Sequence, residues 1–425
     1  MNKNKVELLN ILKNQLVPAL GCTEPIAVAY SAASASEKVS GELEKIRIRV
    51  SANIYKNGLK VGIPGTGERG LLIAAALGYL GGDPEKDLEV IEDVTDSQVE
   101  EAREMIDNKI VEIDVAEDIS RFYIETIIVT NKEKVRSITL DKHLNIIDME
   151  QVAFDSELSD FDIPTEKGGQ ELKKLQNYNL EDIMEFVREV NIDKLTFLEE
   201  GITLSRAIAE EGLKQRTFLA AGFNPGDCDK ETNLINETQR LCAAASEARM
   251  TGSKKAVMSN SGSGNQGITA FLTVLGAADV LEADHEQLLR ALALSNLMTI
   301  YIKSYLGVLS AMCGAGIAAG TGASAGVVYL LDGGTEEIYK AAINMLGVVT
   351  GMICDGAKEG CAYKVALSAG WAVRSALIAV KGTMIDSSNG ILSEDFSQLL
   401  ENLSYINDPG MTSTDKAILD VMTRS

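Results

Sequence analysis

The stretch Ile46-Arg47-Ile48-Arg49-Val50 alternates β-branched apolar residues with arginines, which is the pattern of a half-buried β-strand. Its three apolar side chains therefore share one face. Asn57-Gly58, a pair typical of a type I′ turn, follows and leads into Leu59-Lys60-Val61. Together these signals predict a β-hairpin, and they make the first part of the chain a sheet structure rather than a helical bundle.

Helical and strand patterns alternate after this stretch. Helices are predicted at Leu71 to Leu80 and within Pro84 to Asn108, and strands at Ile110 to Val115, Phe122 to Thr130 and Val135 to Leu140, with a turn at Asn131-Lys132. Strands with helices between them and hairpins at both ends indicate an α+β layer structure. We expect an antiparallel-rich sheet with helices on one face.

The pattern changes beyond a linker, Asp160 to Gly169, that contains Pro164 and Gly168-Gly169. Apolar residues then recur at three- and four-residue spacing in Leu180–Val190, Leu195–Glu211, Thr232–Arg249, Gln266–Leu281, Gln287–Tyr305, Glu336–Met352 and Val365–Lys381. We therefore expect an α+β domain over residues 1–165 and an all-α domain of closely packed helices over residues 170–425.

Composition limits the class of protein. The 425 residues include 40 basic and 62 acidic side chains, and the formal charge of −22 argues against nucleic acid or an anionic membrane as a partner. The N-terminus lacks the continuous apolar region of a secretory signal, so we expect a cytoplasmic protein. The uncharged run Leu306 to Leu331 has the length of a membrane span, but its glycines favour a buried pair of closely packed helices.

Six cysteines are too few for a disulfide framework in a chain of this length. Cys313, Cys354 and Cys361 lie in apolar, glycine-rich surroundings with the spacing C-x40-C-x6-C. Three thiolates suit an iron–sulfur cluster with one open iron, although zinc also accepts three thiolates and water. The alternative is that they are simply buried apolar side chains.

Cys22 lies in the string Gly21-Cys22-Thr23-Glu24-Pro25. Thr23 is a good helix N-cap and Pro25 suits a first turn, so the thiol is expected at a helix N-terminus, where its pKa is lowered. Cys22 is therefore a candidate base or metal ligand, or else a small buried residue in a turn. Glu24 is a candidate base or a partner for a substrate ammonium group, but an acid in the first turn also stabilises a helix.

A glycine- and serine-rich loop, Ser259 to Gly267, precedes a predicted helix. Its exposed N–H groups and hydroxyls favour a carboxylate or phosphate, and it lacks the Gly-Lys-Ser/Thr of a nucleotide-binding loop. The candidate contacts are Asn260, Ser261, Gly262, Ser263 and Asn265. Pro64 to Gly70, with Thr66 and Gly67, is a weaker version of the same pattern. A flexible interhelical loop is the alternative.

The remaining chemistry-bearing residues have structural explanations. His143 lies in an expected turn and His285 near a helix start, so both are predicted at the surface. Cys228 lies in a turn and Cys242 on an alanine-rich helix face. We assign both cysteines to structure.

Four strings resemble motifs of the L-cysteine desulfidase family, which is related to the iron–sulfur L-serine dehydratases. They are Pro18 to Ala29, Gly65 to Gly70, Ser259 to Gly267 and Met352 to Cys361. The resemblance covers nearly the whole chain, and its motifs are long and occur in the family's order. It implies conversion of L-cysteine to pyruvate, ammonia and sulfide without pyridoxal phosphate. It also implies an oxygen-sensitive 4Fe-4S cluster in which one iron has no protein thiolate.

The resemblance implies that Cys313, Cys354 and Cys361 are the cluster ligands. Related serine dehydratases have a C…C-x10-C set, and because the last spacer is shorter here, Cys22 competes with Cys361 for the third position. Otherwise Cys22 is the expected base. The Ser261 to Asn265 loop would hold the substrate carboxylate, with Thr66 or Gly67 contributing from the other domain.

The expected partner is a small amino acid, L-cysteine, and a homo-oligomer is compatible with the sequence. Two other functions remain open. One is an L-serine dehydratase with the same cluster type, and the other is a non-enzymatic protein that binds zinc or an amino acid.

Overall fold

A five-stranded sheet organises the N-terminal part of this computed structural model, which describes residues 3–116, 119, 122–155, 170–215 and 228–424. The strand order is β3-β2-β4-β5-β6. β2 and β3 are parallel and the other neighbours are antiparallel. The strands are β2 (Leu43–Ser51), β3 (Val111–Ala116), β4 (Tyr123–Thr130), β5 (Lys134–Leu140) and β6 (Ile146–Gln151).

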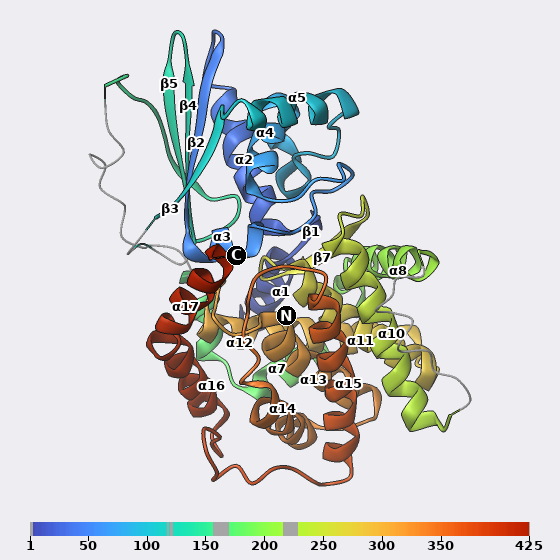
Figure 1. Cartoon of the computed structure of the whole chain (residues 1–425). Coiled ribbons are helices and arrows are strands. Elements are labelled where there is room, and N and C mark those ends of the chain that lie inside the picture. Colours follow the sequence, from blue (N-terminus) through green and yellow to red (C-terminus); the bar gives the residue numbers. More distant parts are fainter. Residues whose placement is uncertain (1–2, 117–118, 120–121, 156–169, 216–227, 425) are drawn as a thin grey trace.

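Helices cover one face of this sheet, as the α+β prediction required (Figure 1). They are α2 (Thr23–Ser36), α4 (Leu71–Gly81) and α5 (Asp96–Asp107), with a 3₁₀ turn at Pro84–Glu89. The apolar residues Ile46, Ile48 and Val50 are buried against the helices α2 and α4. The alternation in β2 therefore defines the core of this domain.

The predicted hairpin after β2 is wrong. Residues Ala52–Gly58 form the helix α3, and β2 pairs with β3 and β4 instead. The side chains of Lys56 and Asn57 are buried, and they contact segments far along the chain. These contacts outweigh the local turn preference of Asn57-Gly58. The second predicted hairpin is confirmed, since β4 and β5 pair across Asn131-Lys132.

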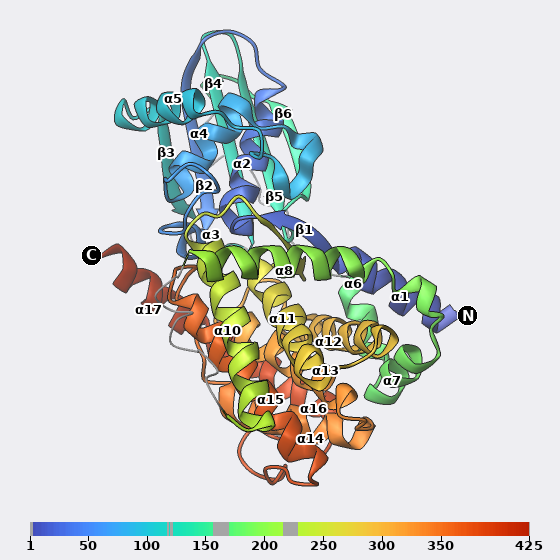
Figure 2. The same ribbon diagram turned by 90° about the vertical axis from the view of Figure 1, so that its right-hand side faces the viewer.

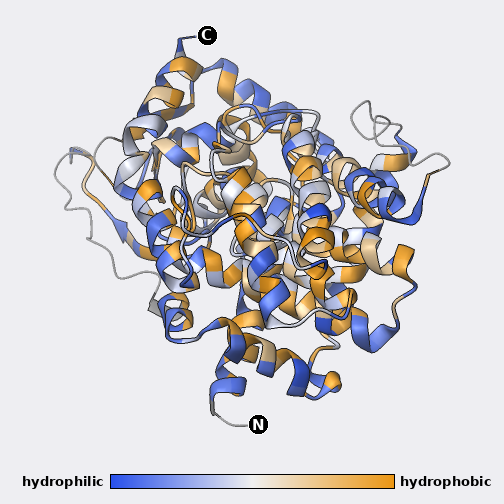
Figure 3. Ribbon diagram, turned by 90° about the horizontal axis from the view of Figure 1, so that it is seen from below, coloured by the Kyte–Doolittle hydropathy of each residue, from blue (hydrophilic) through white to orange (hydrophobic). Residues whose placement is uncertain are grey.

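Each helix predicted in the second half is present, with ends shifted by a few residues. The helices are α7 (Leu180–Glu189), α8 (Leu198–Lys214), α10 (Lys230–Met250), α11 (Gly264–Leu281), α12 (His285–Leu306), α14 (Thr335–Val349) and α15 (Cys361–Val380). Four more are α6 (Gln170–Lys173), α13 (Gly320–Leu330), α16 (Phe396–Tyr405) and α17 (Thr412–Thr423). One apolar core joins them, apart from α17, whose one buried residue is Asp415. Figure 3 shows apolar and polar residues alternating along these helices.

The N-terminal segment joins the two parts of the protein. The helix α1 (Lys3–Gln15) packs into the core of the helical part, although it belongs to the range 1–165 predicted for the other domain. The strand β1 (Leu16–Leu20) pairs antiparallel with β7 (Ala256–Asn260), a short strand of the helical part (Figure 1). Figure 2 shows β1 between α1 and the α+β part. The predicted linker, residues 160–169, lies outside the described residues.

The uncharged run from Leu306 is divided by the fold. It includes the end of α12, a loop, a π-helical turn at Ala315–Ala319 and then α13. Gly320 and Gly322 do not break the helix, because α13 begins at Gly320 and continues from the π turn without a gap. None of the helices in the described parts of the chain combines the length and apolar character that a membrane crossing requires.

Candidate active site

Both parts of the protein contribute to one small cavity, of about 100 Å3. The α+β part supplies Cys22, Thr23, Glu24, Asn57 and His143 to its wall. The helical part supplies the three other candidate cysteines, the start of α11 and the loop after α12. The cavity therefore brings together residues that are far apart in the sequence, and a site between domains is a common location for small ligands.

Backbone pairing places two of the cysteines side by side. Cys313 N–H donates to Met352 O at 2.8 Å, and Cys354 N–H donates to Ala311 O at 2.7 Å. Cys361 is the first residue of α15, and its thiol donates to Gly356 O at 3.7 Å. The loop between α14 and α15 thus carries two of the cysteines and pairs with the segment that carries the third.

The three thiols are close enough to affect one another. Burial raises the pKa of Cys313, and the neighbouring Cys354 and Cys361 raise it further. Burial also raises the pKa of Cys361, with Cys354 acting in the same direction. A bound cation would oppose these shifts and favour the thiolate forms of Cys313 and Cys361.

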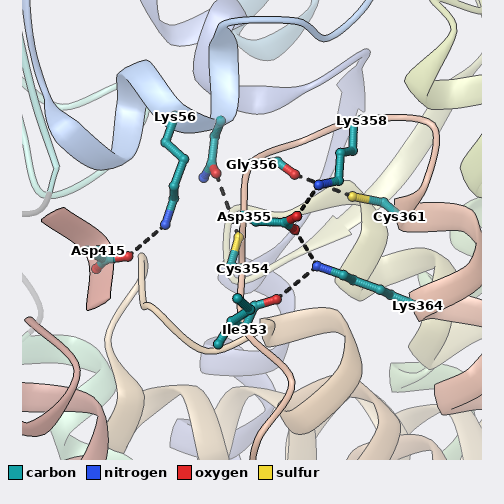
Figure 4. A network of polar contacts seen from close by, with 10 residues as sticks. Lys56, Ile353, Cys354, Asp355, Gly356, Lys358, Cys361, Lys364 and Asp415 are labelled. Carbon is teal, nitrogen blue, oxygen red and sulfur yellow. Dashed lines mark hydrogen bonds and ion pairs between the residues drawn. The ribbon is translucent and has the colours of Figure 1, made fainter. Parts of the chain in front are cut away.

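Charged side chains hold the segment between α14 and α15 that carries Cys354, here called the cysteine loop (Figure 4). Asp355 is ion-paired with both Lys358 and Lys364, and Lys364 Nζ also donates to Ile353 O at 2.9 Å. Although partial burial opposes it, the hydrogen bonds from these two lysines lower the pKa of Asp355 to about 2. The loop is therefore held by charge-assisted contacts on both sides of Cys354.

Cys22 lines the same cavity and lies directly before α2. It is itself the N-cap residue of that helix, so the predicted N-cap at Thr23 is off by one position. Its thiol donates to Glu24 Oε2 at 3.0 Å. Asn57 Nδ2 donates to Glu24 Oε1 at 2.9 Å, and Cys354 Sγ donates to Asn57 Oδ1 at 3.7 Å. A chain of hydrogen bonds thus runs from Cys22 through Glu24 and Asn57 to Cys354.

The predicted lowering of the Cys22 pKa is wrong. Burial raises the pKa of this thiol well above its ordinary value, and the charge of Glu24 adds to the effect, while Arg249 opposes it. The helix N-terminus does not compensate, because desolvation of a thiolate that is 4% exposed is the larger effect. Among these neighbouring side chains, Cys22 is therefore a protonated thiol near neutral pH.

Glu24 is the ionised member of this pair. Burial opposes ionisation, but the charge of His143 and hydrogen bonds from Cys22 and Asn57 lower the pKa of the carboxyl group. Burial lowers the pKa of His143, and Arg249 adds to this while Glu24 opposes it. A neutral His143 leaves the two hydrogen bonds as the main stabilisers of the Glu24 carboxylate near neutral pH.

His143 is a functional candidate that the sequence analysis placed at the surface. It is only 5% exposed, and it lines the cavity from the turn between β5 and β6. Its ring makes an edge contact with Phe122, with centroids 4.8 Å apart. The one available signal was that the chain contains two histidines in all. His285 is exposed, as predicted.

Buried polar residues of the helical part were also missed. Arg249, Gln266 and Lys303 line the cavity although each lies in a helix that is mostly apolar around it. Lys303 Nζ donates to Val308 O at 2.9 Å. An arginine or lysine on the buried face of a helix was the signal in the sequence, because such residues are seldom buried without a partner.

The cavity includes part of one of the two predicted glycine-rich loops, Ser259 to Gly267. Gly262, Ser263 and Asn265 line it, at the start of α11. Asn260 and Ser261 are buried beside it: Asn260 bonds Asn296 and accepts from the Ser261 hydroxyl at 2.9 Å. Thr66 and Gly67 lie outside its wall, and Thr66 Oγ1 donates to Ile63 O at 2.9 Å. Substrate contact by these residues stays a prediction.

The arrangement of the donor side chains limits the kind of metal centre that the cavity could hold. Among the described residues, no three His, Cys, Asp or Glu side chains converge where one metal ion would bind them all. A single zinc ion requires such convergence, at about 2.3 Å from each sulfur. In an iron–sulfur cluster the thiolates bind different irons and stand further apart. Three thiols spread over one cavity wall fit the cluster better.

Comparison with known proteins followed from this geometry. A family model described as serine dehydratase alpha chain matches residues 85–420. A UPF0597 protein of Clostridium tetani is 42% identical over 420 residues, which is 98% of this chain and 97% of that protein. A UPF0597 protein of Oleidesulfovibrio alaskensis is 40% identical over 421 residues, 97% of each chain. One from Caldanaerobacter subterraneus subsp. tengcongensis is 38% identical over 425 residues, 100% of each.

Proposed function

Because the chain belongs to the serine dehydratase alpha chain family, we propose that it is a lyase that eliminates sulfide from L-cysteine, giving pyruvate and ammonia. One observation carries this proposal: the thiols of Cys313, Cys354 and Cys361 and the Cys22–Glu24 pair line the same cavity. A cluster site and a proton-transfer pair are the two parts that an α,β-elimination without pyridoxal phosphate needs.

Cys313, Cys354 and Cys361 are the proposed ligands of a 4Fe-4S cluster. Cys361 shares a cluster of apolar contacts with Cys22, so both reach the same part of the cavity. The hydrogen bond of Cys22 to Glu24 supports a separate role for Cys22 and leaves Cys361 as the third ligand. When bound there, a cluster with one iron free of protein thiolate supplies a Lewis acid for the substrate's carboxylate and sulfur.

The Cys22–Glu24 pair is the proposed base. The carboxylate lies 3.0 Å from the Cys22 sulfur, so it can take the thiol proton as the sulfur takes the proton from the substrate Cα. Asn57 holds the other carboxylate oxygen and so fixes its orientation. The thiol and carboxylate are arranged like a nucleophile and its base, but here the sulfur removes a proton and forms no bond to carbon.

The elimination itself is a two-electron process without an oxidant. The electron pair of the Cα–H bond forms the Cα–Cβ double bond, and the Cβ–S bond breaks with its electron pair on sulfur. The aminoacrylate product tautomerises to an imine, and water hydrolyses the imine to pyruvate and ammonia. Sulfide leaves with the proton released from the pair.

The glycine-rich loop at the start of α11 is the proposed carboxylate site. Gly262, Ser263 and Asn265 reach the cavity where backbone N–H groups of a helix N-terminus are unpaired within the helix. Neutralising the carboxylate increases the acidity of the Cα proton. The predicted contribution of Thr66 or Gly67 would require them to move toward the cavity.

Competing substrates test the proposal. Protein reconstituted with iron and sulfide under anaerobic conditions is expected to release sulfide from L-cysteine with a higher kcat/KM than it releases pyruvate from L-serine. The reverse order would make the protein an L-serine dehydratase with the same site. Protein that binds zinc, stays colourless after reconstitution and turns over neither amino acid would contradict both enzymatic functions.

A further inference from the structure

Polar atoms on one side of the cavity lack partners. His143 Nε2, Arg249 Nε and Gln266 Oε1 have no hydrogen-bond partner within the described parts of the chain. Their residues are 5%, 3% and 3% exposed. Buried polar groups are nearly always hydrogen-bonded, and these three line one cavity. Their unused capacity therefore indicates a polar ligand.

Arg249 shows which charge the ligand has. Its Nη1 atom donates to Asn265 Oδ1 at 3.1 Å, and none of the described carboxylates forms an ion pair with it. A buried guanidinium without a counter-charge is rare, because the charge is costly to desolvate. A carboxylate is the group that matches the planar donor fork of arginine.

The glycines of the loop let two side chains approach it closely. A Cβ atom at Gly262 would lie 2.7 Å from His143 Cε1, and one at Gly264 would lie 2.4 Å from Arg249 Nε. The imidazole and the guanidinium therefore pack against the backbone that begins α11, an 18-residue helix. Side-chain donors and helix N–H groups thus face the same space.

We propose that Arg249 and His143 form the receptor for the α-carboxylate of a small free amino acid, with Glu24 and Gln266 facing its ammonium group. The inference rests on the proposed function and names the side chains that would recognise its substrate. The histidine tautomer with the proton on Nε2 donates to one carboxylate oxygen, and the arginine binds the other. Gln266 Oε1 and the Glu24 carboxylate are acceptors for N–H groups.

The cavity is small, at about 100 Å3, and its wall also carries the three cysteines proposed for the cluster. A ligand with a short side chain is therefore the class expected beside them.

Binding of unreactive ligands to anaerobically purified protein tests this receptor. L-alanine has both charges and no leaving group, whereas ethylamine lacks the carboxylate. In titration calorimetry, Arg249→Lys is expected to weaken L-alanine at least about tenfold and to leave ethylamine unchanged, because lysine keeps the charge but loses the fork. His143→Gln should weaken L-alanine by a smaller factor. Arg240→Lys, in a pair with Glu237 on the same helix α10, is the matched control.

Two outcomes overturn the receptor: wild-type protein that does not bind L-alanine, or Arg249→Lys and Arg249→Met variants that bind it as tightly as Arg240→Lys does. Circular dichroism of each variant separates lost binding from lost folding. The proposed function fails separately. If L-alanine binding depends on Arg249 but neither L-cysteine nor L-serine is consumed, the receptor is supported and the proposed function is contradicted. If Arg249→Lys consumes L-cysteine with an unchanged KM, the proposed function is supported and the receptor is contradicted.

Discussion

The Cys22 thiol and the Glu24 carboxylate are joined by a 3.0 Å hydrogen bond inside a cavity that three other cysteines also line. The two residues are neighbours at the start of one helix, but their environments give them opposite protonation states. Burial raises the pKa of Cys22, while the charge of His143 in its protonated form and hydrogen bonds from Cys22 and Asn57 outweigh burial and lower the pKa of Glu24. These shifts keep the proton on sulfur at rest, where the carboxylate orients the thiol. Transfer of that proton to Glu24 requires a positive charge near the sulfur, which lowers the pKa of Cys22.

Replacing Glu24 tests this pair. Glu24→Gln keeps an oxygen for Asn57 but removes the proton acceptor, so kcat for sulfide release should fall by about 100- to 10,000-fold. Iron content should stay at the wild-type level. Glu92→Gln, at an exposed carboxylate that pairs with Lys86, is the control. Wild-type turnover in Glu24→Gln would exclude the carboxylate as the acceptor.

Metal content distinguishes cluster ligands from the other cysteines. Serine at Cys313, Cys354 or Cys361 is expected to lower the iron bound per chain and to reduce the brown absorption after anaerobic reconstitution, because a hydroxyl is a poor iron ligand. Cys228→Ser, at an exposed position, should retain both. Cys22→Ser should retain iron and lose turnover. Iron lost from Cys22→Ser and kept by Cys361→Ser would reverse their assignments.

The C-terminal helix is fixed by a buried ion pair. Lys56 Nζ lies 2.8 Å from Asp415 Oδ1, with side-chain exposures of 1% and 10%, and so α17 is tied to α3 beside the cysteine loop (Figure 4). Asp415→Ala leaves a buried ammonium group without its partner, and the free energy of unfolding should fall by about 3–5 kcal/mol. Adding Lys56→Met should recover part of that loss. Chemical denaturation measures both.

The matched control for this pair is Lys214–Glu210, which is exposed on α8. Glu210→Ala should change the free energy of unfolding by less than about 0.5 kcal/mol. Equal effects of Asp415→Ala and Glu210→Ala would show that the C-terminal helix contributes nothing specific to stability.

His143 should make stability depend on pH. Burial lowers its folded-state pKa below the ordinary 6.5, with Arg249 adding to the shift and Glu24 opposing it. As pH falls below 6.5, the unfolded chain takes up this proton and the folded protein does not. The free energy of unfolding should therefore fall with decreasing pH, down to the folded-state pKa.

Denaturation of wild type and His143→Gln between about pH 7.5 and pH 5.5 measures this contribution. The difference in stability between the two proteins should shrink as pH falls, since only wild type has the histidine. A difference that is constant with pH would mean that the imidazole titrates alike in the folded and unfolded states.

Alanine substitutions at two glycines with similar backbone conformations distinguish the stability cost of backbone strain from the cost of a side-chain clash. Gly262 has φ +77° and packs on His143, whereas Gly67 has φ +73° and open space around it. Alanine at Gly67 should cost about 1–2 kcal/mol through the left-handed backbone alone. Alanine at Gly262 should cost about 1–3 kcal/mol more, because the imidazole must move. His143→Ala in the Gly262→Ala background should remove the extra cost if the contact is its cause.

Sequence patterns located most elements but misassigned one. The helical periodicity of Thr232–Arg249 and the alternation in Ile46–Val50 each survive in the fold as α10 and β2, because both patterns record which face is buried. Asn57-Gly58 has equally clear turn chemistry, yet it ends the helix α3. Here a buried lysine and a buried asparagine with distant partners decided the local structure.

The strands β1 and β7 show a second limit of prediction from local sequence patterns. Each is five residues long and pairs with the other across about 240 positions of sequence. Neither run has a strand pattern of its own, and the pairing exists because the segments before Cys22 and before the Ser261 loop meet at the cavity. No local window of the sequence includes both.

The sequence by itself determined the family, the α+β and helical parts, and the set of cysteines, since motif order and hydrophobic period are properties of the chain. The tertiary structure alone decided the protonation of the Cys22–Glu24 pair and the burial of His143 and Arg249. A pKa and an unpaired polar atom depend on what surrounds a side chain, and those surroundings come from both parts of the protein. Cys22 is a helix-end thiol by sequence, and it becomes a protonated partner of Glu24 only when the cavity forms around it.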